Sequence, residues 1–263
     1  MSIKILFIGD IFGEPGREAV KILVPKLRET HRLDLVIANC ENAAQGRGVT
    51  VKMANEFFKN SIDFLTSGNH IWHSFDIYPF LGVPNCKLLR PANLSREAPG
   101  KGAGIVETKG GVRVAVFNIM GKIFMNPVPD CPFKAVDELI GQFSDESDLM
   151  VLDFHAETTS EKRAMGWHVD GKLQAFVGTH THVATADEEV LPKGCAYITD
   201  LGMTGPHNSV IGQNKESVIR RFRTSLPVKF EVGSGDVRLN GAIVEIDEKT
   251  KKAISIKRVC ERL

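Results

Sequence analysis

Short apolar runs that end in carboxylate, amide or imidazole side chains recur along the first 180 residues of the chain. Three runs come first, at residues 3–8, 33–38 and 62–66, and each has the length and composition of a buried strand. The polar residues that follow them are Asp10, then Glu41 with Asn42, then Asn69 with His70. A single such residue could be a turn or helix-capping residue. Three in succession instead predict one shared site, because open α/β sheets bind ligands beyond the carboxyl ends of their strands.

Two later apolar runs, at residues 149–154 and 173–177, lead to histidines. His155 follows the first run, and His180 and His182 follow the second within Gly178-Thr179-His180-Thr181-His182. In extended backbone, residues two apart project to the same face, so His180 and His182 are expected to point side by side at one target. Neutral imidazole is the commonest protein metal ligand. The His-x-His pair therefore indicates a metal site, with two solvated loop histidines as the alternative.

Helical periodicity separates these strands and sets the fold class. A helix is expected to open at Pro15, and further helices are expected at residues 51–60, 133–143, 160–168 and 215–222. The alternation predicts an α/β protein with a mostly parallel or mixed sheet flanked by helices. After Pro227, residues 228–232, 237–246 and 253–259 read as strands, and the polar turn between the last two predicts an antiparallel C-terminal hairpin. Because no linker or internal repeat is evident, residues 1–263 are expected to form a single domain.

Composition excludes several classes of protein. A chain of 263 residues that is 43% hydrophobic and 25% charged is ordinary for a globular protein, and its net charge of +1 gives no argument for a polyanion-binding surface. The five cysteines are scattered without a CxxC pair, which favours reduced thiols in the cytoplasm over a disulfide framework. Residues 5–8 are too short a run for a secretory signal, and no apolar run approaches the ~20 residues of a membrane helix. We therefore expect a cytoplasmic protein without a membrane segment.

The strand ends together supply two carboxylates, two amides and four imidazoles. These candidate site residues are Asp10, Glu41, Asn42, Asn69, His70, His155, His180 and His182. They offer more donors than one tetrahedral site uses, and the number fits a pair of metal ions bridged by one carboxylate. Such a pair holds a hydroxide as nucleophile and clamps the oxygens of a phosphoryl centre. The donor set thus predicts hydrolysis of a phosphate ester.

The blocks that carry these donors resemble the calcineurin-like metallophosphoesterase superfamily. They are Gly9-Asp10, Glu41-Asn42, Gly68-Asn69-His70, His155 and Gly178-Thr179-His180-Thr181-His182. This chain departs from the family pattern in having Phe12 at the first histidine, Glu41-Asn42 in place of an aspartate, and Thr179 between Gly178 and His180. With these departures it resembles the YmdB-type branch over almost its whole length. The resemblance implies a single metallophosphoesterase domain with a four-layer α/β/β/α sandwich, mixed sheets and an antiparallel C-terminal hairpin.

The resemblance also implies a role for each donor. It makes Glu41 the bridge between two divalent or mixed-valence ions, with iron or manganese as the metal. One ion would have as ligands Asp10, Asn42 and His182, and the other Asn69, His155 and His180. The resemblance leaves His70 unliganded beside the phosphate, as proton donor to the leaving oxygen or as a stabiliser of the transition state.

The implied substrates are phosphodiesters, in particular 2',3'-cyclic nucleotides, with RNA as a further ligand and a homo-oligomer as the expected assembly. One alternative is a regulatory protein that keeps the metal centre to bind a nucleotide or RNA with little turnover. An amidohydrolase barrel is disfavoured because its His-x-His comes from the first barrel strand, and the spacing of Gly9, Gly13 and Gly16 does not match a dinucleotide loop.

The remaining histidines and two aromatic residues have plainer interpretations. His31, His73, His168 and His207 are expected outside the metal site, with His73 and His207 the best candidates among them to touch substrate. Packing is the favoured role of Trp72 and Phe12, and stacking on a base is the alternative.

Overall fold

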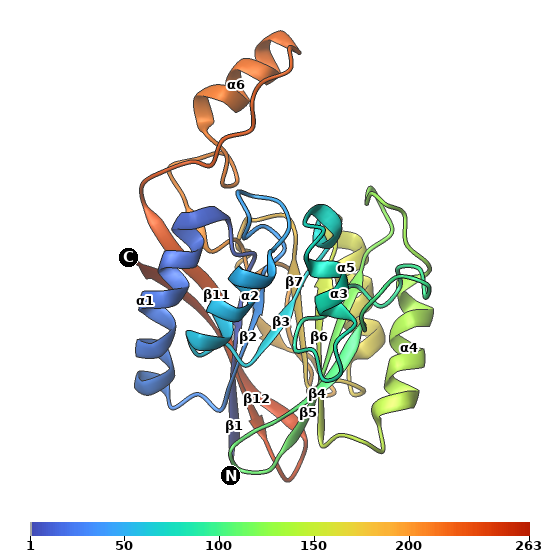
Figure 1. Ribbon diagram of the computed structural model, residues 1–263. Coiled ribbons are helices and arrows are strands. Elements are labelled where there is room, and N and C mark those ends of the chain that lie inside the picture. The colour runs from blue at the N-terminus through green and yellow to red at the C-terminus, as the bar shows by residue number, and fades with distance from the viewer. Residues whose placement is uncertain (1) are drawn as a thin grey trace.

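Two six-stranded sheets form the centre of the protein in the computed structural model, which describes residues 2–263 (Figure 1). The first sheet has the order β10-β11-β1-β2-β3, and β12 pairs with the outer side of β11. Strands β1, β2 and β3 are parallel to one another, whereas β11 is antiparallel to β1. The strands of this sheet are β1 (Ser2–Ile8), β2 (Leu35–Asn39), β3 (Phe64–Thr66), β10 (Gly205–Pro206), β11 (Val237–Asp247) and β12 (Lys252–Arg262).

The second sheet has the order β4-β5-β6-β7-β9-β8. Its four central strands are parallel, and β4 and β8 are antiparallel edge strands. The strands are β4 (Ala103–Glu107), β5 (Arg113–Met120), β6 (Leu149–His155), β7 (Ala175–Thr179), β8 (Glu189–Val190) and β9 (Ala196–Ile198). Both sheets are therefore mixed, as the sequence predicted.

Helices cover the outer face of each sheet, with α1 and α2 on one side and α4 and α5 on the other (Figure 1). The helices are α1 (Gly13–His31), α2 (Val51–Lys59), α3 (Ile77–Leu81), α4 (Pro132–Phe143), α5 (Thr159–Val169) and α6 (Lys215–Thr224), with a 3₁₀ turn at Ile71–His73. Helix α6 stands away from the sandwich (Figure 1), and its residues are all at least partly exposed. None of the helices within residues 2–263 is long and apolar enough to cross a membrane.

Alternation along β1 shows how the layers are held together. Leu6 and Ile8 pack against the first pair of helices, whereas Ile5 and Phe7 face the second sheet. A third cluster joins the second sheet to its helices through residues such as Phe154. Successive side chains of a strand point to opposite faces, so a strand that is apolar on both faces must lie between two layers. The expected four-layer α/β/β/α sandwich is confirmed.

The C-terminal hairpin is confirmed and one predicted strand is wrong. Strands β11 and β12 pair antiparallel along their length around the turn at residues 248–251. Residues 228–232, which we expected to be a strand, instead form irregular chain with an isolated bridge between Gln213 and Val232. This segment returns from the projecting α6 with all five residues at least partly exposed, and among residues 2–263 its backbone pairs with the loop residues Gln213 and Asn214 rather than with a strand.

We predict that Phe7→Ala lowers the free energy of unfolding by about 3–5 kcal/mol, because it leaves a cavity between the two sheets. Phe7 is only 2% exposed. Urea unfolding followed by circular dichroism measures the change. The control is Phe75→Ala, which removes a side chain that is 83% exposed and is expected to stay within about 0.5 kcal/mol of the parent protein. An equal loss of unfolding free energy in the two variants would contradict the position of Phe7 between the sheets.

Candidate metal centre

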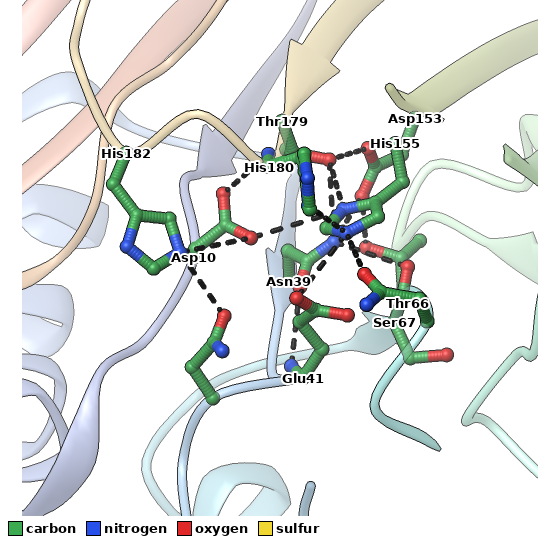
Figure 2. Close-up of polar contacts among 12 residues, drawn as sticks. Asp10, Asn39, Glu41, Thr66, Ser67, Asp153, His155, Thr179, His180 and His182 are labelled. Atoms are coloured by element: carbon green, nitrogen blue, oxygen red, sulfur yellow. Dashed lines mark hydrogen bonds and ion pairs between the residues drawn. The ribbon is translucent and has the colours of Figure 1, made fainter. Parts of the chain in front are cut away.

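The polar ends of strands from both sheets meet at one edge of the sandwich. The first sheet contributes Asp10 after β1, Glu41 and Asn42 after β2, and Asn69 and His70 after β3. The second sheet contributes His155, the last residue of β6, and the two histidines that follow β7. Figure 2 shows Asp10 lying between His182 on one side and His155 with His180 on the other. All eight predicted site residues are brought to this region.

One group of donors surrounds the Nε2 atom of His155. This nitrogen lies 3.2 Å from Oε1 of Glu41, 3.2 Å from Oδ1 of Asn69 and 3.0 Å from Nδ1 of His180. A single imidazole nitrogen has either one hydrogen or one lone pair, so it cannot satisfy all three neighbours at once. The ligand atoms of Glu41, His155 and His180 all lie within 4.8 Å of one another. A carboxylate, an amide oxygen and two imidazoles in this arrangement fit a bound metal ion.

A second group lies beside the first, around Nε2 of His182. This atom is 3.2 Å from Oδ1 of Asn42 and 3.9 Å from Oδ1 of Asp10. The Oδ1 atom of Asp10 is buried and has no hydrogen-bond partner within residues 2–263. A buried carboxylate oxygen left without a donor is costly, and a cation between these three side chains would satisfy it. Phe12, fully buried, packs edge-on against the His182 ring with centroids 5.5 Å apart.

The side-by-side arrangement predicted for His180 and His182 is wrong. Strand β7 ends at Thr179, and both histidines have left-handed backbone, with φ of 99° and 65°. They consequently point to different places, His180 to His155 (Figure 2) and His182 to Asn42. Left-handed backbone is unfavourable for residues with a Cβ and persists only where the surroundings fix it.

Asp200 holds the loop at residues 180–182 in place through hydrogen bonds. Its Oδ2 atom accepts hydrogen bonds from the backbone N–H and the hydroxyl of Thr181, at 3.1 and 2.8 Å. The ammonium of Lys162 lies 2.6 Å from the same oxygen, and this ion pair is fully buried. The backbone N–H of His180 donates to Oδ2 of Asp10 at 3.1 Å. These bonds hold Thr181 in place between the two histidines. As a result, His180 faces the first donor group and His182 faces the second.

A chain of hydrogen bonds behind His155 was missed by the sequence analysis. The Thr179 hydroxyl donates to Asp153 at 2.7 Å and lies 2.9 Å from Nδ1 of His155, so it must accept from that ring nitrogen. In neutral His155 the proton is therefore on Nδ1. The lone pair of Nε2 then faces the candidate metal-ligand atoms of Glu41, Asn69 and His180. Asn39 and Thr66 also donate to Asp153, which is buried. The one signal in the sequence was Thr179 itself, which interrupts the family's Gly-His-x-His block.

Burial and close charges shift the pKa values of these groups in opposite directions. Burial raises the pKa of Asp10 to about 6, although His182 and His155 act to lower it. Burial alone would raise the pKa of Glu41, but the charge of His155 and its hydrogen bond hold it well below its usual range. Burial alone would lower the pKa of His155, but Glu41 raises it to about 9. Burial and the charge of His155 lower the pKa of His180 to about 3. At neutral pH the protein without a cation thus pairs Glu41 with protonated His155, and these two side chains would have to lose that proton to hold a cation.

A cavity of about 230 Å³ opens over both donor groups, and its walls include Glu41, Asn42 and His182. The ring of His70 also lines this cavity, while its backbone N–H donates to Oε2 of Glu41 at 3.2 Å. Of the histidines expected outside the centre, His168 pairs with Asp137 at the surface, 3.0 Å away. His73 packs edge-on against the His70 ring, with centroids 4.8 Å apart.

Gly68 lies so close to two of the donor side chains that it leaves no room for a side chain of its own. A Cβ at this position would lie 2.2 Å from both Oε2 of Glu41 and Nε2 of His155. We predict that Gly68→Ala pushes these two donors apart and lowers the amount of metal that the protein retains, measured by elemental analysis after dialysis. The control is Gly141→Ala on α4, where a Cβ meets nothing within 4 Å among residues 2–263. That variant should keep its metal and gain about 1 kcal/mol of stability. Full metal content in Gly68→Ala would contradict the crowding.

Several known proteins are similar to this chain over nearly its whole length. The 2',3'-cyclic-nucleotide 2'-phosphodiesterase of Bacillus subtilis (strain 168) is 47% identical over 258 residues, which cover 98% of this chain and 96% of that protein. The crystal structure of a novel phosphatase from Mycoplasma pneumoniae superposes with a TM-score of 0.92 at 37% identity, covering 100% of this chain and 94% of that one. The crystal structure of a hypothetical protein from Thermus thermophilus also gives a TM-score of 0.92, at 38% identity, with 99% of each chain covered. A family model described as YmdB-like protein matches residues 6–259. This chain therefore belongs to the YmdB-like protein family, as its motif blocks predicted.

Proposed function

We propose that this protein is a metal-dependent phosphodiesterase that hydrolyses 2',3'-cyclic nucleotides. The observation that carries the proposal is the convergence of two donor groups on one cavity that His70 also lines. The relative from Bacillus subtilis is named for this reaction, and it is similar to the chain over nearly its whole length. The expectations of a single domain, a cytoplasmic location and a homo-oligomer stay predictions.

Two metal ions fit the donors, with iron or manganese as the proposed metals and Glu41 as their shared ligand. The first set is Asp10, Asn42 and His182, and the second is Asn69, His155 and His180. When bound, such ions supply a water-derived nucleophile and offset charge on the phosphoryl oxygens. The protein's own contribution is to fix these ligands, through Asp200 for the loop of the two histidines and through Thr179 for the His155 ring.

His70 is the proposed catalytic residue. Its backbone is tied to Glu41, so the ring is positioned relative to the donors but lines the cavity. Burial lowers the pKa of His70, although Glu41 acts to raise it, so the neutral ring predominates at pH 7 without a cation. Its N–H would then donate a hydrogen bond to a phosphoryl or leaving oxygen, and the protonated ring would donate the proton itself.

A different function is open to the same centre, in which the protein binds a nucleotide or RNA as a regulator with little turnover. RNA ends with a 2',3'-cyclic phosphate present the same reacting group as the cyclic nucleotide. An unliganded imidazole in the cavity favours the enzyme, because a binding protein does not need a proton donor beside the phosphate. Turnover on a cyclic nucleotide discriminates between the two.

We predict that the manganese-loaded protein hydrolyses adenosine 2',3'-cyclic phosphate, and that His70→Ala lowers kcat by roughly 10²–10⁴-fold because it removes the group proposed to donate a hydrogen bond or a proton to the leaving oxygen. Chromatography of the products measures the rate, and elemental analysis should show the same metal content in both proteins. His168→Ala, at the surface salt bridge with Asp137, is the control with unchanged rate. Absence of hydrolysis by the parent protein would favour the regulator, and loss of metal in His70→Ala would make His70 a ligand.

Glu41→Ala should lose both ions, because one carboxylate is proposed to serve both donor groups. Metal per chain, measured by elemental analysis, should fall toward zero while the circular dichroism spectrum keeps its α/β shape. Glu18→Ala, at an exposed pair with Lys21, should keep the parent's metal. Retention of two ions per chain in Glu41→Ala would reject the shared role.

A further inference from the structure

A second hollow of about 610 Å³ adjoins the cavity over the donor groups. The two spaces share Arg47, His70 and His180 as wall residues. The cavity over the donors, at about 230 Å³, is small, whereas the neighbouring hollow falls in the volume range of small-molecule sites. A ligand whose phosphate lies over the donors therefore has room for its remaining groups in this hollow.

Phe124 is the most conspicuous residue of this hollow. Its side chain is 86% exposed, which is unusual for a phenylalanine, and its backbone is left-handed with φ of 61°. The loop that carries it is nevertheless anchored, because the buried carboxylate of Glu161 accepts hydrogen bonds from the backbone N–H groups of Lys122 at 2.9 Å and Ile123 at 3.3 Å. An apolar ring is thus presented to solvent on a fixed support at the rim of the site.

Two further walls suit a nucleotide. Trp72 lines the hollow, and its position is fixed because its carbonyl accepts from the Tyr78 hydroxyl at 2.8 Å and its ring packs edge-on against the Tyr78 ring. Arg47, exposed on the wall shared with the donor cavity, adds positive charge to that wall, with its guanidinium over the Phe230 ring at 5.2 Å from the centroid. The hollow therefore combines aromatic surface at its outer part with charge on the side of the metal centre.

We propose that this hollow, here named the base hollow, binds the nucleobase of the substrate, with Phe124 stacking on its face. This assignment rests on the proposed function, since it takes the phosphate to lie over the donor groups. Stacking on an aromatic side chain tolerates any base, because every base has a π-face. The base hollow thus selects nucleotides over phosphodiesters without a base, and does not select strongly among the bases.

Phe124→Ala should lower kcat/KM for adenosine 2',3'-cyclic phosphate by roughly 5- to 150-fold, the loss expected from removing one stacking contact. The same variant should act like the parent on 1-O-methylribose 2',3'-cyclic phosphate, which lacks a base. Phe124→Tyr keeps a ring and should keep the rate on the nucleotide. Phe222→Ala, on α6 and 79% exposed, is the matched control.

Binding without turnover gives an independent measurement. Adenosine added to the manganese-loaded protein should change the fluorescence of Trp72, with Trp167→Phe as the background, and ribose should leave it unchanged. Phe124→Ala should weaken the adenosine titration by a factor similar to its loss in kcat/KM.

The possible outcomes separate the two proposals. If the parent protein hydrolyses neither ester, the proposed function fails. If it hydrolyses both equally well, or if Phe124→Ala loses equally on both, the phosphodiesterase stands and the base hollow is overturned. If Phe124→Ala changes neither rate but alters the elution of the protein in size-exclusion chromatography, Phe124 belongs to a protein interface instead, and the base hollow is likewise overturned.

Discussion

The buried contact between Glu41 and His155 joins the two halves of this protein. Glu41 follows β2 of the first sheet and His155 ends β6 of the second, yet Oε1 and Nε2 lie 3.2 Å apart with both side chains excluded from solvent. Charge placed in such surroundings is stable only when paired, so the two sheets must keep their strand ends together. The apolar layer between the sheets supplies the force that does this, through Phe7 and its neighbours. The packing of the two sheets and the assembly of the donor cluster therefore depend on each other.

The surroundings of the donors determine their directions. Left-handed backbone at His180 and His182 has a free-energy cost, and the buried Lys162–Asp200 pair with its bonds to Thr181 offsets it. Asp153 and Thr179 perform a similar task for the His155 ring. Because the groups within each of these two sets are hydrogen-bonded to one another, a change in one of them should alter the angles of the donors before it unfolds the protein.

The space around the centre separates the tasks that a phosphodiesterase must perform. The small cavity over the donors suits a phosphate group, and the adjoining base hollow, with Phe124 held on its anchored loop, suits the rest of a nucleotide. Arg47, His70 and His180 belong to both spaces. His70 thus lies between the cavity where the phosphate ester is proposed to be cleaved and the base hollow where the nucleobase is proposed to bind.

The sequence alone predicted most of the longer strands of the sandwich, the hairpin and the set of candidate donor residues, because apolar runs of strand length with polar ends leave few alternatives in an α/β protein. It did not predict the short strands β8, β9 and β10, which are too brief to show a periodic pattern. The strand that the sequence predicted at residues 228–232 does not form, since strand formation depends on a pairing partner that local sequence does not reveal. The sequence also could not assign directions to His180 and His182, because local periodicity assumes extended backbone and the contacts with Asp200 and Asp10 impose another conformation. Only the tertiary structure brought Phe124 to the site and linked Thr179 to His155, since those relations join loops and strands whose proximity is decided by how the two sheets pack.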